Sequence, residues 1–197
     1  MTDTTSAAPS TTEVTRHEMH HRRIDMRGWG RSDGLYEVEG RIADRKPHEF
    51  KSPNGFKVVA AGEPIHDMGV RLVFDSEMVV REVATFTSSA PYDDCFSAGP
   101  TLQALKGLRI GAGWNSEVRK RLGGARSCTH LMELLSPMAT VAYQTLTMFR
   151  MAQADIVDGT GKPVKIDSCF AYAGHRDVVK RKWPVFYTGP QDEPSPP

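Results

Sequence analysis

The sequence lacks the features that mark membrane proteins, secreted proteins and proteins with a strong overall charge. Its 25 Lys and Arg residues balance 24 Asp and Glu residues, so the net charge of +1 gives no overall field to attract nucleic acid or a membrane surface. No apolar run approaches the length that spans a bilayer. The opening stretch MTDTTSAAPSTTEV has neither a basic start nor an apolar run, so it does not match a secretory signal.

Cysteine is scarce, and several familiar catalytic motifs are absent. The three cysteines are odd in number and spread along the chain, so they do not indicate a disulfide framework. The short glycine clusters GAG and LGG lack the spacing of a phosphate-binding loop, and no serine-centred nucleophile elbow occurs. We therefore expect a cytoplasmic protein with reduced thiols and with no nucleic-acid or membrane partner.

What remains is the composition of a globular protein with polar ends. Hydrophobic residues make up 39% of the chain and charged residues 25%, which are globular values. Residues 1–15 are rich in Thr, Ser, Ala and Pro, and residues 189–197 read GPQDEPSPP. Neither end has enough apolar surface to offset the entropy of ordering. The sequence predicts two disordered tails around a single domain over residues 16–188.

Hydrophobic periodicity predicts strands first and helices afterwards. Segments 34–46 and 65–75 alternate apolar and polar residues, and 78–87 is rich in strand-forming residues, as in an antiparallel meander. Segments 101–108, 115–124 and 129–151 have helical spacing, with Pro137 expected to kink or break the last one. The segments 165–172 and 178–187 suggest further extended chain. This order predicts an α+β fold in which helices cover one face of an antiparallel sheet of at least three strands.

The stretch GGARSCTHLMELL (123–135) concentrates reactive side chains at the predicted start of a helix. On a helix His130 and Glu133 share a face, and Cys128 would lie at the positive end of the helix dipole, which favours a thiolate. The three residues could be metal ligands, a nucleophile with its base, or an ordinary helix cap with a buried thiol. The stretch alone leaves these alternatives open.

Two other junctions between predicted elements carry residues of the same kinds. His66 and Asp67 stand where a strand should begin; adjacent side chains in a regular strand point to opposite faces, but just before the strand both could face one site. Cys95 follows the third predicted strand. A mixed set of thiolate, imidazole and carboxylate groups suits zinc or iron. We expect a metal site formed from His66, Asp67, Cys95, Cys128 and His130.

One further stretch is basic and rich in histidine. Residues 16–23, RHEMHHRR, could meet an anionic substrate or a metal, but a solvated surface segment is the simpler interpretation.

Several of these motifs resemble a known family. The run PIHDM, the segment RIGAGWNSEVRKRLGG and the pattern C-T-H-L-x-E-L-L-x-x-M-A-T-V-A resemble a bacterial family, domain of unknown function 2889, over most of residues 20–150. This resemblance supplies a family but almost no biochemistry.

A looser resemblance, over residues 58–150, is to the NifU N-terminal type of iron–sulfur scaffold protein. GEPIHD (62–67) stands where those proteins have G-A-P-x-C-G-D, Cys95 where they have a second cysteine, and Cys128-Thr129-His130 where a His-Cys pair opens a long helix. The first cysteine is missing and the His-Cys pair is rearranged, so a three-cysteine cluster site is not preserved. The resemblance implies a NifU N-terminal-like topology and a metal-binding pocket more than it implies cluster assembly.

These patterns together predict a small metal-binding protein. We expect a metal-dependent enzyme of lyase or hydrolase type acting on a small organic acid or its thioester, with Glu133 or Asp67 as the acid–base group and zinc or iron as the cofactor. The alternatives are a non-catalytic metal or iron–sulfur carrier and a binding module whose site is only structural. The expected partner is a small-molecule substrate, and a homo-oligomer is compatible with the sequence.

Overall fold

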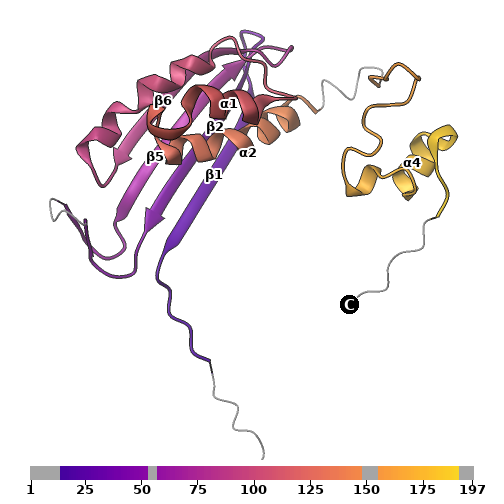
Figure 1. Cartoon of the computed structure of the whole chain (residues 1–197). Coiled ribbons are helices and arrows are strands. Elements are labelled where there is room, and N and C mark those ends of the chain that lie inside the picture. The colour runs from indigo at the N-terminus through magenta and orange to yellow at the C-terminus, as the bar shows by residue number, and fades with distance from the viewer. Residues whose placement is uncertain (1–13, 53–56, 148–154, 191–197) are drawn as a thin grey trace, which may run out of the picture. The chain divides into compact units, whose positions relative to one another are not determined.

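The computed structural model describes residues 14–52, 57–147 and 155–190 (Figure 1). Its internal contacts divide the chain into two compact units, Met1–Leu146 and Thr147–Pro197. The single domain expected over residues 16–188 stays a prediction. Most of the two expected tails, 1–15 and 189–197, lies outside the described residues. Within those residues, no helix combines the length and the hydropathy that crossing a membrane requires.

The first unit is built on a four-stranded antiparallel sheet in the order β1-β2-β5-β6. Its strands are β1 (His21–Gly30), β2 (Tyr36–Arg45), β5 (Pro64–Phe74) and β6 (Val80–Ser89). The segment that connects β2 to β5 contains the two-residue strands β3 (Phe50–Lys51) and β4 (Val58–Val59), which pair with each other in a separate small sheet. The α+β class and the strands predicted over 34–46, 65–75 and 78–87 are confirmed.

Strand β1 is the strand of this four-stranded sheet that the sequence analysis missed. Residues 16–23 are exposed, as expected of a surface segment, but from His21 onward they belong to a strand that pairs with β2 along its whole length. The strand gives a weak signal because its inward face carries only Ile24 and Met26 as large apolar side chains, and both remain partly exposed. A strand at the edge of a sheet does not need the full alternation of a buried one.

Two α-helices cover one face of this sheet (Figure 1). Helix α2 (Thr129–Thr145) packs against β1, β2 and β5, and helix α1 (Trp114–Leu122) packs against α2. The sequence predicted both helices, but α2 continues without interruption through Pro137, and residues 148–151 of the predicted segment lie outside the described residues. The helix expected over 101–108 is instead a 3-10 helix, η2 (Gly99–Leu105); shorter 3-10 turns are η1 (Asp93–Ser97) and η3 (Gly124–Arg126).

The core lies between the sheet and α2. Gly40 on β2 lets the helix approach closely, because a Cβ atom there would lie 2.9 Å from Met138 Sδ. The indole Nε1 of Trp114 donates a hydrogen bond of 2.9 Å to the carbonyl of Leu135, which satisfies a polar group inside this core. Fully buried members of the core from both layers include Ile42, Met68, Leu72, Phe74, Leu131, Leu134, Leu135 and Met138.

The second unit is small and rich in turns. It contains α4 (Asp177–Lys182) and the 3-10 turns η4 (Phe170–Tyr172) and η5 (Pro184–Phe186). The rings of Tyr172 and Trp183 pack with their centroids 5.7 Å apart, and Trp183 Nε1 donates to Asp155 at 2.9 Å. The extended segments predicted at 165–172 and 178–187 are therefore wrong. In short apolar runs, periodicity alone does not distinguish a strand from a helix.

Candidate metal centre

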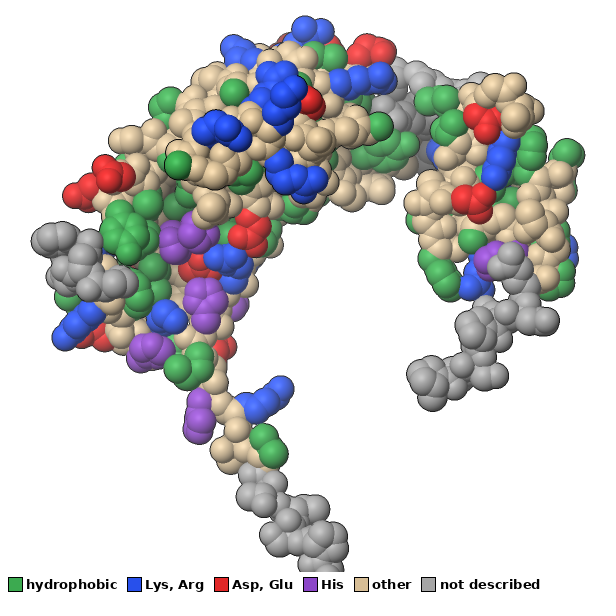
Figure 2. Space-filling model, viewed as in Figure 1, with side chains coloured by type: hydrophobic (Ala, Val, Ile, Leu, Met, Phe, Trp, Pro, Cys, Tyr) green, Lys and Arg blue, Asp and Glu red, His purple; other side chains and the backbone are tan. Residues whose placement is uncertain are grey.

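A row of three polar side chains crosses the helix-covered face of the sheet at one end. Arg22 on β1 is the cross-strand partner of Asp44 on β2, and Asp44 is the partner of His66 on β5. Directly opposed residues on one face of an antiparallel pair bring their side chains into contact. The register alone therefore places an arginine, a carboxylate and an imidazole side by side. Figure 2 shows histidine side chains grouped with acidic and basic ones near the end of the sheet where the chain enters β1.

The N-terminal part of α2 adds two more groups over this row. His130 and Glu133 lie three residues apart on the helix, so they share a face. The ring centroids of His130 and His66 are 3.9 Å apart, and His130 Nε2 lies 3.9 Å from Asp44 Oδ2. Arg22 Nη1 donates a hydrogen bond of 2.6 Å to Glu133 Oε2, which ties the helix start to the edge strand.

Asp44 is the centre of this group, with a side chain only 1% exposed. Arg22 donates to both of its oxygens, from Nε to Oδ1 and from Nη2 to Oδ2, each at 2.8 Å, and His20 Nε2 lies 3.1 Å from Oδ1. Burial alone would raise the pKa of this carboxyl, but the hydrogen bonds and charge of Arg22, with smaller contributions from His66 and His20, hold the pKa below its ordinary value. Asp44 is therefore a carboxylate at neutral pH.

His66 presents a buried nitrogen without a well-aligned hydrogen bond. Its Nδ1 lies 3.1 Å from Asp44 Oδ2, close enough for an ion-pair contact, but the geometry satisfies no hydrogen bond among the described residues. We therefore regard the contact as electrostatic. Burial lowers the pKa of His66, and the neighbouring His130 lowers it further while Asp44 opposes the change. At neutral pH this imidazole is uncharged, with a lone pair available.

One ligand atom each from Asp44, His66 and His130 lies within 4.8 Å of the other two. A carboxylate and two imidazoles form a donor set that suits zinc, or iron in the arrangement of two histidines and one carboxylate. A neutral imidazole and an ionised carboxylate are the protonation states that metal binding requires. The residues present therefore fit a divalent transition-metal ion.

Neither of the two predicted cysteine ligands belongs to the three-residue cluster that the described residues form, although Cys128 interacts with His130. Burial raises the pKa of Cys128, but a hydrogen bond with His130 and the backbone amides of Leu131 and His130 outweigh that effect, and the net pKa is lowered. Burial raises the pKa of Cys95, and the nearby Cys128 raises it further. The Sγ of Cys128 lies 3.8 Å from Met68 Sδ, so the thiol faces the core between sheet and helix.

Asp67 is on the wrong face of the sheet for the site that the sequence analysis assembled. The strand begins at Pro64, before both residues, so His66 and Asp67 point to opposite faces. Asp67 instead accepts hydrogen bonds from Arg41 on the face without helices, one of them 2.7 Å long. The expectation that these two neighbours both precede the strand is wrong. Glu133, the other predicted acid–base residue, lies next to the three-residue group through Arg22.

Sequence reasoning missed Asp44 and its partner Arg22. The alternation of side chains along β2 was the available signal. Every second residue of a strand faces the same side, so Asp44 lies on the same face as the apolar residues Tyr36, Val38 and Ile42. A charged residue in such a position is seldom fully buried unless it is paired. Arg22 could not be paired with it, because the strand that carries Arg22 was not predicted.

Comparison with known proteins identifies the family. The family model described as "Protein of unknown function (DUF2889)" matches residues 20–144, which contain the whole four-stranded sheet, α1 and all of α2 except its last residue. The match includes Arg22, Asp44, His66, His130 and Glu133. The chain belongs to the DUF2889 family. No curated protein and no solved structure matches the chain. The NifU-like topology of this DUF2889 domain therefore stays a prediction without a structural neighbour to support it.

Proposed function

We propose that the DUF2889 domain binds one divalent zinc or iron ion through Asp44, His66 and His130. The observation that carries this proposal is the convergence of their three ligand atoms within 4.8 Å of one another, from two strands and the start of a helix. Metal–ligand distances near 2 Å require somewhat closer donor atoms, roughly 3 to 4 Å apart. Small side-chain rotations supply this difference.

The surroundings of the site favour an ion that is held firmly. The ion pair between Arg22 and Asp44 fixes the orientation of the carboxylate and directs Oδ2 towards both imidazoles. Hydrogen-bonded partners of this kind orient metal ligands and tune their basicity. Arg22 is therefore a positioning residue, and its own contact with Glu133 extends the network to the surface.

We further propose that the domain is a metal-dependent enzyme of lyase or hydrolase type that acts on a small organic acid or its thioester. Three protein ligands leave a coordination position open, and a bound ion there would lower the pKa of water or polarise a carbonyl group. The position of Glu133 supports a role for it as the proton donor or acceptor. Its side chain is 44% exposed and is hydrogen-bonded to Arg22, which in turn contacts Asp44. The half-exposed carboxylate is within reach of a substrate arriving from solvent.

A second candidate function is a metal carrier that does not catalyse a reaction. The observation in its favour is the thiol of Cys128, which interacts with His130 and has a lowered pKa, so that a soft fourth ligand is at hand. A closed site with four protein ligands holds a metal without leaving a position for substrate. Replacing Cys128 by Ser separates the two candidates. A closed site that uses the thiol as its fourth ligand would lose affinity for the metal, whereas an open site with three ligands would not.

Metal analysis of the purified full chain tests the proposal. Protein prepared without oxygen should contain close to one equivalent of zinc or iron, and His66→Ala and His130→Ala should each lose it. His48→Ala is the matched control, because His48 is exposed and is not part of the cluster of Asp44, His66 and His130. Retention of the ion by both site variants, or its absence from the wild-type chain supplied with either metal, would refute the proposed centre.

A further inference from the structure

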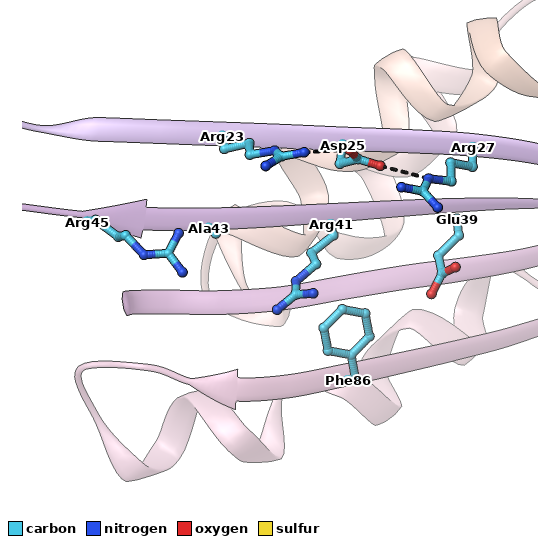
Figure 3. A pocket seen from close by; sticks show the side chains of 8 residues that line it. All are labelled: Arg23, Asp25, Arg27, Glu39, Arg41, Ala43, Arg45 and Phe86. Atoms are coloured by element: carbon cyan, nitrogen blue, oxygen red, sulfur yellow. Dashed lines mark hydrogen bonds and ion pairs between the residues drawn. The ribbon is translucent and has the colours of Figure 1, made fainter. Parts of the chain in front are cut away.

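The face of the sheet opposite α2 has a hollow lined largely by arginine. Because side chains alternate along a strand, Asp44 faces the helix while its neighbours Ala43 and Arg45 face the other side. A cavity of about 400 Å³ opens on that side, lined by residues of β1, β2 and β6 (Figure 3). It is separate from the proposed metal centre, which lies on the covered face.

The floor of the hollow is apolar and flat. Gly69 on β5 has no side chain, and the ring of its cross-strand partner Phe86 occupies that space, so that a Cβ at Gly69 would lie 2.3 Å from the ring. The ring therefore rests on the sheet surface. Ala43, between β1 and β5, is the small residue that leaves the adjoining space open.

The rim is cationic, and its charges are only partly matched. Four arginines line the hollow with two carboxylates, Asp25 and Glu39, and Arg41 is also paired with Asp67 on the same face, which leaves one positive charge uncompensated. Arg23 and Arg27 share Asp25, each through a single contact of 3.2 Å (Figure 3). In the described part of the chain, no hydrogen bond or ion pair engages Arg45. Its five donors are therefore available to a ligand.

We propose that this hollow binds a small planar dianion, a conjugated or aromatic ring that carries two carboxylates or a phosphate monoester. Arginine guanidinium groups match carboxylate and phosphate oxygens in paired hydrogen bonds. The ring of Phe86 offers a stacking surface, and Arg41 lies 5.8 Å from its centroid, so cation and ring meet at one place.

Two features favour a small ligand over a nucleic-acid strand or an acidic peptide. The carboxylates of Asp25 and Glu39 interrupt the positive charge along β1 and β2, so there is no continuous basic track. The chain as a whole has a net charge of only +1, which provides little long-range attraction for a polyanion. The donors of Arg45, with those of Arg23 and Arg27 that Asp25 does not occupy, instead suit a compact ligand with several acidic oxygens.

Titration of the full chain with terephthalate and with phenyl phosphate, followed by calorimetry and by amide chemical shifts, tests this proposal. We expect saturable binding at a single site by at least one dianion, with weaker binding of benzoate, which has one charge, and of succinate, which has no ring. The better ligand identifies the acidic group. Shifts should centre on Ala43 and Phe86 and should be unaffected by His66→Ala, which would remove the proposed metal centre.

Arg45→Gln is the decisive variant, because it removes no contact that holds the fold. Loss of one charged hydrogen-bonding partner should weaken the binding of the dianion about tenfold. Arg71→Gln is the control, since Arg71 is exposed on the same sheet face but does not line the hollow. Equal weakening by both variants, no saturable binding up to about 10 mM, or tighter binding of a single-stranded oligonucleotide or an acidic peptide would each overturn the proposal.

Discussion

Asp44 and His66 stand directly opposite each other on β2 and β5, and 3.1 Å separates the carboxylate Oδ2 from the ring Nδ1. Strand register fixes this relationship, so the pair does not depend on a flexible loop. His130 reaches the same carboxylate oxygen from the start of α2. The sheet thus supplies two donors of the proposed metal centre and the helix supplies the third.

Breaking the ion pair of Asp44 should destabilise the metal-free chain. Asp44→Asn keeps the size of the side chain but leaves the guanidinium of Arg22 without its main partner. We expect a loss of about 2 kcal/mol in the free energy of unfolding, measured by urea denaturation in the presence of a chelator. Glu49→Gln should change the stability little, because Glu49 is exposed and its ion pair with Lys51 lies at the surface. Equal stability of the two variants would mean that the buried pair contributes nothing.

The lowered pKa of His66 predicts a dependence of stability on pH. As the pH falls below about 6.5, the unfolded chain takes up this proton before the folded chain does, so this contribution to stability is complete above that value and is lost as the pH falls further. Denaturation of metal-free protein between about pH 7.5 and 5 should show the loss. His66→Asn should flatten the profile; an unchanged profile would contradict the assignment. Asp44, His130 and Arg22, which face the ring, remain in the variant.

Close packing at Gly40 predicts a strong difference between two glycines of the sheet. A larger side chain at Gly40 would collide with Met138 on α2, whereas no atom of the described residues lies within 4 Å of a Cβ at Gly30. Gly40→Val should cost about 1 to 3 kcal/mol of stability through overpacking. Gly30→Val should be neutral or mildly stabilising, since valine favours strands. Thermal or urea unfolding of both variants compares them directly, and similar effects would show that α2 does not approach the sheet at Gly40.

The two partly buried thiols should differ in reactivity. Alkylation of Cys128 in the metal-free chain should reach its midpoint below the free-thiol value of about pH 8.5, and alkylation of Cys95 above it. Mass spectrometry of iodoacetamide-treated protein across pH distinguishes the two sites. His130→Asn should raise the midpoint of Cys128, whereas His48→Asn should not. A midpoint for Cys128 that is the same in both variants would mean that His130 does not tune the thiol.

The sequence predicted the parts of the fold that rest on strong periodicity. The alternation around Tyr36, Val38 and Ile42 indicated β2, and helical spacing from Leu131 to Leu146 indicated α2. Strand β1 was missed because an edge strand with mostly exposed residues carries little hydrophobic pattern. The turns after residue 155 depend on individual contacts such as that of Trp183 with Asp155, which local periodicity does not encode.

The candidate site was predictable only in part for a related reason. His66 and His130 were recognisable as histidines at the ends of predicted elements. The third donor, Asp44, becomes apparent only when strand register aligns it with Arg22 on one side and His66 on the other. Asp67 was included because the strand was expected to begin after it, where both neighbours could face one site, whereas the strand begins at Pro64.

X-ray absorption spectroscopy of the metal-loaded full chain tests the proposed centre most directly. Coordination by Asp44, His66 and His130 predicts a first shell of nitrogen and oxygen near 2.0 to 2.1 Å, imidazole scattering beyond it, and no sulfur near 2.3 Å. The spectrum should be the same in Cys128→Ser, and the imidazole contribution should fall in His66→Ala. A sulfur shell in the wild-type chain that disappears in Cys128→Ser would contradict the assignment of these three residues as the ligand set.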